Sequence, residues 1–162
     1  MGTFDQVFRE NAPFVWRTLR RLGVREADVD DVCQEVFVVV HRKLAEFEGR
    51  SSLRTWIYGI CIRTASAHRK LARHREMPTD SPPEREAEGT PHESLARRRA
   101  LEKLDRALGE LDEDKRTVFV LYEIEELGMA EIAEIVGCPL QTAYSRLHAA
   151  RDKVQAAMKE AK

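Results

Sequence analysis

The sequence has few of the residues that mark extracellular, metal-binding or membrane-spanning proteins. Its cysteines, Cys33, Cys61 and Cys138, are odd in number, far apart and free of any CxxC pair. The pattern therefore predicts neither a disulfide framework nor a zinc site. No signal peptide is visible at the N-terminus, and the longest apolar run, Val36 to Val40, is too short to cross a bilayer. We expect a soluble protein of the reducing cytoplasm, with no membrane insertion, metal or cofactor.

Signals for β-strands are also lacking. No stretch alternates apolar and polar residues between hairpin turns, whereas apolar residues recur at helical spacing along most of the chain. The sequence predicts an all-α fold of two small helical domains joined by a flexible acidic linker, with a helix-turn-helix in the second domain. We place the first domain at residues 1–75, the linker at residues 76–94 and the second domain at residues 95–162.

Proline is scarce outside the predicted linker. Four of the six prolines lie in residues 76–94, a segment with a net charge of −5 and almost nothing apolar to bury. Such a segment cannot offset the entropy cost of becoming ordered, so we expect it to be flexible.

The first domain is expected to contain helices separated by short turns. Apolar spacing predicts one or two helices that end near Gly23, where a glycine C-cap fits. Asp28 or Asp30 can cap the next helix, because a short acidic side chain accepts hydrogen bonds from a first helical turn. A loop over residues 48–52 then leads into a helix that runs towards Leu71.

The net charge of −1 hides one strongly basic segment. Residues 50–75 contain seven arginines and lysines and no acidic residue, with Trp56 and Tyr58 among them. Such a segment can hold a polyanion, and the aromatic rings offer faces on which bases can stack. A solvated helix face with two core aromatics gives the same pattern, and the segment alone does not separate the two. The basic residues are Arg50, Arg54, Arg63, Arg69, Lys70, Arg73 and Arg75.

Residues 129–148 fit a helix-turn-helix. Gly137 lies where the turn requires a positive φ, and Asp112 is suited to cap an earlier helix of the same domain. An exposed side of the second helix can place side chains against base edges and phosphates in the major groove. A plain helical hairpin that only packs is the alternative. The second helix is expected to bury Leu140, Ala143, Leu147, Ala150 and Val154, and to expose Thr142, Ser145, Arg146, His148, Ala149 and Arg151.

Two motifs in the right order resemble bacterial sigma factors of the extracytoplasmic-function class. The first comprises residues 30–37 (DDVCQEVF) and 47–58 (FEGRSSLRTWIY), and the second comprises residues 131–137 (EIAEIVG) and 142–151 (TAYSRLHAAR). The likeness covers nearly the whole chain. It implies a subunit without catalytic activity that binds core RNA polymerase and directs it to selected promoters.

The resemblance also assigns roles to particular residues. Asp31, Gln34 and Glu35 are expected on the helix that docks on the coiled coil of the polymerase β′ subunit, where an acidic face suits a basic partner. The implied partners are core polymerase, through its β′ and β subunits, promoter DNA and an anti-sigma factor. The residues expected at the melted −10 element are Arg50, Ser51, Ser52, Arg54, Trp56, Arg63, Arg69 and Arg73. Those expected at the −35 duplex are Thr142, Tyr144, Ser145, Arg146, His148, Ala149 and Arg151.

The chain departs from the family pattern at several of these positions. Arg63 stands where an asparagine is usual, so the preferred −10 base is expected to differ. Tyr144 and Ala149 stand where basic residues are usual, which predicts a weaker −35 contact or a different sequence preference. Gly128 stands at a usual serine or threonine cap, a mild loss.

These departures leave one alternative open, an adaptor that binds polymerase or a partner protein without reading a promoter. A DNA-modifying enzyme is not supported, because no nucleophile–base pair or carboxylate–metal constellation is visible.

Overall fold

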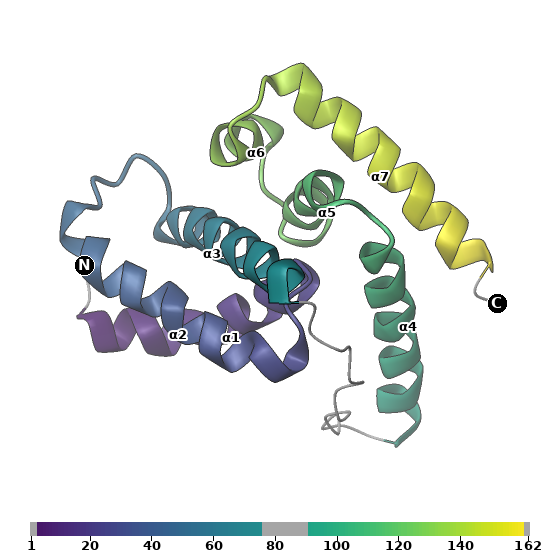
Figure 1. The fold of residues 1–162 in the computed structure, drawn as a ribbon, viewed down its shortest axis with the longest axis horizontal. Helices are drawn as coiled ribbons and strands as arrows, with labels where there is room; N and C mark the ends of the chain where they lie inside the picture. The colour runs from purple at the N-terminus through teal and green to yellow at the C-terminus, as the bar shows by residue number, and fades with distance from the viewer. Residues whose placement is uncertain (1–2, 76–90, 161–162) are drawn as a thin grey trace. The chain divides into compact units, whose positions relative to one another are not determined.

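The computed structural model describes residues 3–75 and 91–160, and all regular structure within these ranges is helical (Figure 1). The all-α prediction is confirmed. The chain forms two compact units, one that contains α1 to α3 and another that contains α4, α5, the first part of α6, and α7. None of the described helices is long and apolar enough to cross a membrane. The elements are α1 (Phe4–Arg21), α2 (Glu26–Lys43), the 3₁₀ helix η1 (Leu44–Glu46), α3 (Leu53–Arg75), α4 (Pro91–Gly109), α5 (Glu113–Phe119), the π-helix η2 (Val120–Ile124), α6 (Met129–Val136) and α7 (Leu140–Glu160).

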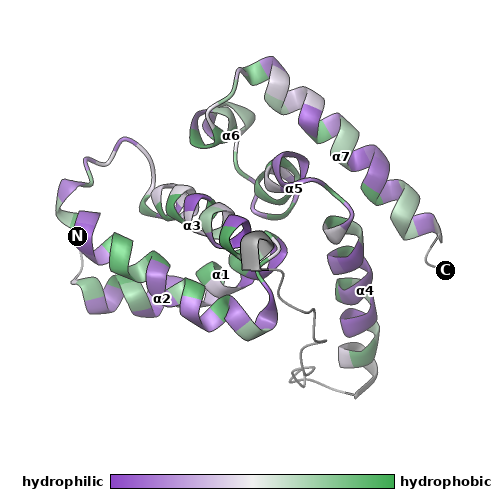
Figure 2. Cartoon of the chain, in the orientation of Figure 1, coloured by the Kyte–Doolittle hydropathy of each residue, from purple (hydrophilic) through white to green (hydrophobic). Residues whose placement is uncertain are grey.

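The three helices of the N-terminal unit pack against one another around a shared apolar core. Each helix carries both hydrophobic and hydrophilic positions (Figure 2), and the hydrophobic side faces inward because burying it removes apolar area from water. Val15 and Leu19 of α1, Val32 of α2 and Ile57 of α3 have no exposed surface. This core fixes which sides of α2 and α3 remain available to partners.

A single helix, α1, precedes the turn at Gly23, whose φ of 101° is the positive value expected of a glycine after a helix end. Two arginines hold the carbonyl groups of this turn. Arg20 donates to the Val24 carbonyl at 2.7 Å, and Arg69 reaches across from α3 to the Leu22 carbonyl. The turn between α1 and α2 is therefore tied to the third helix of the unit.

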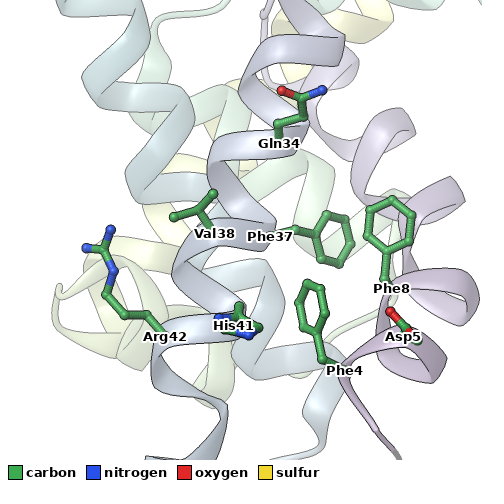
Figure 3. A pocket seen from close by; sticks show the side chains of 8 residues that line it. All are labelled: Phe4, Asp5, Phe8, Gln34, Phe37, Val38, His41 and Arg42. Atoms are coloured by element: carbon green, nitrogen blue, oxygen red, sulfur yellow. The ribbon is translucent and has the colours of Figure 1, made fainter.

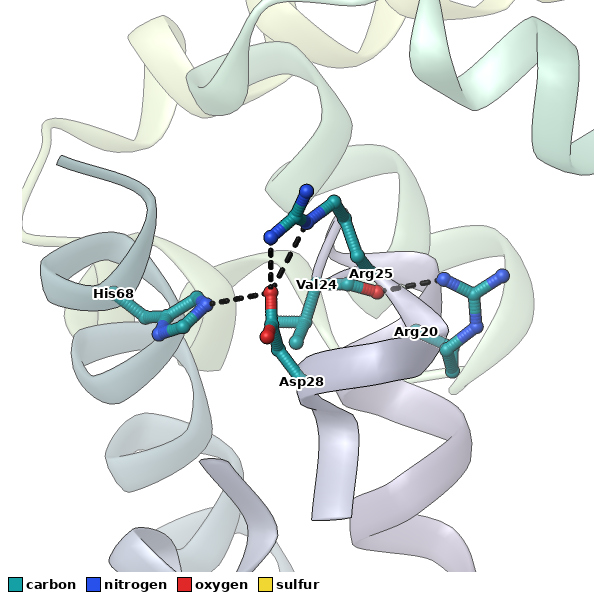
Figure 4. Close-up of polar contacts among 5 residues, drawn as sticks. All are labelled: Arg20, Val24, Arg25, Asp28 and His68. Carbon is teal, nitrogen blue, oxygen red and sulfur yellow. Dashed lines mark hydrogen bonds and ion pairs between the residues drawn. The ribbon is translucent and has the colours of Figure 1, made fainter. Parts of the chain in front are cut away.

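The prediction that Asp28 or Asp30 caps α2 is wrong, because the helix starts earlier and its N-cap is Arg25. Asp28 lies in the first turn, where a carboxylate is favoured by the helix dipole. It accepts from Arg25 at 3.0 Å and lies 3.4 Å from Nε2 of His68 on α3 (Figure 4). Asp30 accepts from the indole nitrogen of Trp16 at 3.2 Å. Both aspartates thus link helices rather than begin one.

In the C-terminal unit, α7 packs against α4 and α5. Asp112 caps α5, as predicted, by accepting from the Lys115 backbone N–H at 2.9 Å. The linker prediction falls mostly on residues 76–90, which lie outside the described residues. The structure places residues 91–94, which the sequence analysis assigned to the linker, at the start of α4. Proline suits a first helical position, because the N–H that it lacks has no partner there.

The helix-turn-helix consists of α6 and α7 joined at Gly137, whose φ is 73°. Ala143, Leu147, Ala150 and Val154 are buried, as predicted. Leu140 is 48% exposed, so the prediction that it is buried is wrong. As the first residue of α7 it precedes the turn of helix that packs against the rest of the unit.

Arg116 of α5 is 8% exposed, and its guanidinium group holds the end of α4. It donates to the carbonyls of Leu108 at 2.8 Å, Leu111 at 3.1 Å and Gly109 at 3.3 Å. Leu108 and Gly109 lie in the last turn of α4 and Leu111 follows it, where the helix no longer supplies its regular backbone donors. The Leu108 carbonyl also accepts from the Leu111 backbone N–H at 3.1 Å. One buried cation therefore fixes the corner between α4 and the helix that supports α7.

We predict that Arg116→Ala lowers the free energy of unfolding by about 2 kcal/mol or more, because it removes a buried, charged donor from three carbonyls at the end of α4. Urea unfolding followed by circular dichroism measures the loss. The matched control is Arg97→Ala at an exposed position of α4, which should change stability by less than about 0.5 kcal/mol. Equal stability of the two variants would contradict the structural role of Arg116.

Candidate polymerase and nucleic-acid interfaces

The predicted docking residues lie together on one side of α2. Asp31, Gln34 and Glu35 are all exposed. Burial raises the pKa of the neighbouring Cys33 thiol, and the Asp30 carboxylate adds to the shift. The thiol therefore stays uncharged at neutral pH, and the negative charge of this side of α2 comes from its carboxylates.

Next to this acidic side is an apolar pocket of about 570 Å³ between α1 and α2 (Figure 3). The Phe8 and Phe37 rings meet edge to face with centroids 4.8 Å apart, and the Phe4 ring meets His41 in the same way at 4.8 Å. Phe8 is 43% exposed and Val38 is 51% exposed. Apolar side chains left in water at the rim of a pocket are typical of a protein-binding surface. The lining residues are Phe4, Asp5, Phe8, Gln34, Phe37, Val38, His41 and Arg42.

The sequence analysis missed this pocket. Phe4 and Phe8 are spaced to lie on one side of a helix, but the same spacing is typical of core residues. Only Gln34 joins the predicted docking residues to the pocket.

The loop before α3 and the first turn of that helix hold the first predicted −10 residues. Ser52 caps α3, because its hydroxyl accepts from the Thr55 backbone N–H at 3.0 Å. Arg50 is highly exposed and pairs with Glu48 at 3.1 Å, a contact of little energetic value in water. Ser51, which lies between Arg50 and Ser52 in the sequence, donates from its hydroxyl to the Ser52 carbonyl. A serine directly before the first helical residue was the available signal for the cap.

The aromatic residues of the basic segment differ in what they can contact. Tyr58 is 1% exposed and packs on Phe14, so the suggestion that its ring can stack on bases is wrong. Trp56 is half-buried against Phe47, with ring centroids 5.1 Å apart. Arg54 is exposed, with its guanidinium carbon 4.5 Å from the centre of the Phe14 ring.

The remaining predicted −10 residues lie further along α3. Arg63 is exposed and its guanidinium group folds back over Gly59, where a Cβ would lie 3.5 Å from Nη1. Arg69 is half-buried and donates to the Leu22 carbonyl, so at least one of its N–H groups stabilises the fold. Arg73 lies in α3, but its side chain falls outside the described part of the chain. The structure thus separates exposed Arg54 and Arg63 from partly structural Arg69.

The predicted −35 residues line the outer side of α7. Tyr144, Ser145 and His148 are exposed, and the others are partly exposed: Thr142, Arg146, Ala149 and Arg151. The two arginines face acidic residues of the same unit.

Arg146 lies 3.8 Å from Asp114, and Arg151 donates from Nε to the Glu123 carboxylate. The hydrogen bond to Glu123 raises the pKa of Arg151 further above its usual range, so its charge is kept at any physiological pH.

Comparison with known proteins identifies both units. Residues 7–75 match the family described as sigma-70 region 2, and residues 101–154 match the family described as sigma-70, region 4. The chain is 32% identical to the RNA polymerase sigma-H factor of Pseudomonas aeruginosa over 81% of this chain and 73% of that protein. It is also 32% identical to the ECF RNA polymerase sigma-E factor of Escherichia coli K12 over 81% of this chain and 74% of that protein. The chain belongs to the extracytoplasmic-function (ECF) sigma factors.

Solved structures agree with this assignment. The sigma factor RpoE from Bartonella quintana, in complex with the anti-sigma factor NepR, has the same fold, with a TM-score of 0.78, 23% identity and 96% of each chain covered. CnrH in complex with the cytosolic domain of CnrY matches with a TM-score of 0.71 and 26% identity, covering 98% of this chain and 89% of that one. As an ECF sigma factor the protein binds core RNA polymerase and promoter DNA and directs promoter-specific transcription initiation. The adaptor alternative is not favoured.

We predict that Arg69→Ala lowers the free energy of unfolding of this sigma factor by about 1 to 2 kcal/mol, because it removes a charged donor from the Leu22 carbonyl. Arg63→Ala, at an exposed position of the same helix, should leave stability nearly unchanged. Thermal unfolding of the two variants measures the difference. A stable Arg69→Ala variant with reduced affinity for single-stranded DNA would instead favour a role in phosphate binding alone.

Proposed function

We propose that the N-terminal unit binds polymerase through α2 and DNA through α3. The observation that carries this proposal is the opposite charge of the two exposed surfaces. Asp31 and Glu35 are exposed on α2 beside the aromatic pocket, whereas Arg54 and Arg63 are exposed on α3. An acidic surface with an apolar pocket suits a basic helical partner, here the β′ coiled coil, while cations suit phosphates.

The start of α3 and the loop before it receive the melted −10 strand in this proposal. Unpairing and unstacking a base costs a few kcal/mol of free energy, which contacts to the base and to the phosphates must offset. Ser52 fixes the first turn of α3, and Arg50 and Arg54 supply cations on either side of it. Trp56 remains partly exposed and so keeps surface for stacking. Arg69 and Arg73 stay predicted contacts further along the helix.

The C-terminal unit reads the −35 duplex with α7. Its exposed positions combine Tyr144, Ser145 and His148, which can contact base edges, with Arg146 and Arg151, which suit phosphates. Thr142 and Ala149 complete this surface. In the described ranges no three histidine, cysteine, aspartate or glutamate side chains gather as metal ligands. We propose that the protein is a cytoplasmic transcription regulator without catalytic activity.

An anti-sigma factor is a further partner in this proposal. RpoE and CnrH, which share the fold, were each solved with a protein bound, NepR and the cytosolic domain of CnrY respectively. Co-purification from the native host under inducing and non-inducing conditions tests for a counterpart. Recovery with polymerase alone under both conditions would count against it.

In vitro transcription tests the function as a whole. Core polymerase, the full chain and fragments of the host genome are combined, and the transcripts are compared with those made by core polymerase alone. We expect initiation at discrete sites only when the chain is present. Absence of promoter-dependent initiation on every fragment would overturn the proposal.

We predict that Val38→Glu weakens binding to core polymerase roughly tenfold or more, because it places an unpaired carboxylate at the rim of a pocket that becomes buried. Val38 is 51% exposed, so the fold should be kept. Fluorescence anisotropy of the labelled chain with core polymerase measures affinity. Gln155→Glu makes the same charge change at an exposed position of α7 and should not weaken binding. Equal affinity of the two variants would exclude the pocket from the interface.

We predict that Arg63→Asn changes the preferred −10 sequence and leaves affinity for core polymerase unchanged. Arg63 is exposed on α3 and replaces a residue that is usually asparagine in the family. Selection of active promoters from a library randomised in the −10 element measures the preference of each holoenzyme. Identical preferences for the variant and the unaltered chain would exclude Arg63 from −10 recognition.

A further inference from the structure

Arg151 is the most firmly held cation on the exposed side of α7. Its Nε donates to the Glu123 carboxylate, and its guanidinium carbon lies 5.4 Å from the centre of the Tyr122 ring. The side chains of Arg151 and Glu123 remain 37% and 33% exposed. The guanidinium group is therefore fixed by two neighbours and still open to solvent.

The two neighbours are consecutive residues of the π-helix η2, which is itself well anchored. Val120 and Leu121 have no exposed surface. Their carbonyls accept from the backbone N–H groups of Glu125 at 3.0 Å and Leu127 at 2.9 Å. Single π-helical turns within α-helices are often found at functional sites. Here the turn brings an aromatic ring and a carboxylate to one arginine of the recognition helix.

The contact differs from the ion pair that Arg146 makes on the same helix. Arg146 lies 3.8 Å from Asp114, whose side chain is 71% exposed. A long, exposed pair of this kind orders a side chain weakly. The bond from Nε of Arg151 to Glu123 is a direct charge-assisted hydrogen bond, which has a fixed direction.

We propose that Glu123 is a positioning residue that holds Arg151 ready to bind a phosphate of the −35 duplex. This inference rests on the proposed role of α7 in −35 binding. A guanidinium group has five N–H donors in a rigid fork, so a carboxylate on Nε leaves donors for a phosphate. Ordering the long side chain before binding removes an entropy cost that DNA would otherwise have to offset.

The sign of the effect makes the inference testable. Glu123→Gln removes a negative charge near DNA, which by Coulomb attraction alone would strengthen binding. If Glu123 instead positions Arg151, the variant should bind less tightly. A glutamate that merely competes with phosphate for Arg151 would give the opposite result.

The experiment uses the full chain assembled with core polymerase, and a duplex carrying the −35 element of the genomic fragment that this holoenzyme binds most strongly. Affinity is measured from about 50 to 200 mM potassium chloride. Arg151→Ala should reduce the slope of log affinity against log salt by about one unit. Glu123→Gln should lower affinity roughly threefold to tenfold and shift the slope in the same direction. In the Arg151→Ala background, Glu123→Gln should cause no further loss of affinity, because there is no longer an arginine to position.

The matched control is Glu131→Gln, which makes the same charge change at an exposed position of α6 and should not lower affinity. Thermal unfolding checks that all variants are folded, and the salt slope separates a lost phosphate contact from a general loss of stability. Unchanged or tighter binding by Glu123→Gln would overturn the positioning role. If Arg151→Ala binds the duplex as tightly as the unaltered chain, Arg151 does not contact a phosphate and the inference is overturned, while the proposed −35 binding by α7 is not. Failure of the unaltered holoenzyme to bind any duplex would instead overturn the proposed function and this inference with it.

Discussion

In each unit, a buried or half-buried arginine holds the carbonyl groups at the end of a helix, and the surfaces that meet partners depend on it. Arg69 ties α3 to the turn after α1, and Arg116 ties α5 to the end of α4. A charged donor gives a stronger hydrogen bond than a neutral one, so removing it takes a strong bond from these carbonyls. These bonds set the positions of α3 and of the helices that support α7.

The same residue type serves two purposes in this protein, and the surroundings decide which. Arg54 and Arg63 extend over Phe14 and Gly59 at the surface, where their charge is exposed to solvent. Arg151 on α7 combines the two situations, because its side chain is ordered by Glu123 and still stays exposed. A sigma factor must bind DNA phosphates and also keep its two small units folded. The proposed division of the arginines between these tasks would meet both needs in a chain of nearly zero net charge.

The elements were predictable where local signals agree. Helical periodicity, Gly23, Gly137 and the Asp112 cap gave the helices and the turn of the helix-turn-helix, because each depends on its own neighbours. Long-range contacts were not predictable. Nothing in the sequence shows that Arg69 meets the Leu22 carbonyl, that Phe4 and Phe8 line a pocket with Phe37, or that Tyr58 is buried. The assignment of Asp28 as a cap failed for the same reason, since its partners include His68 forty residues away.

Mapping transcript start sites made by the reconstituted holoenzyme on the host genome tests most directly whether two separate units read two promoter elements. The prediction is a shared two-part motif upstream of the start sites, with a nearly constant spacing between its parts. Weakening α7 contacts should reduce initiation through the upstream part, and changing Arg63 should alter the downstream part. Start sites that depend on the chain but share no motif, or share only one part, would contradict recognition by both units.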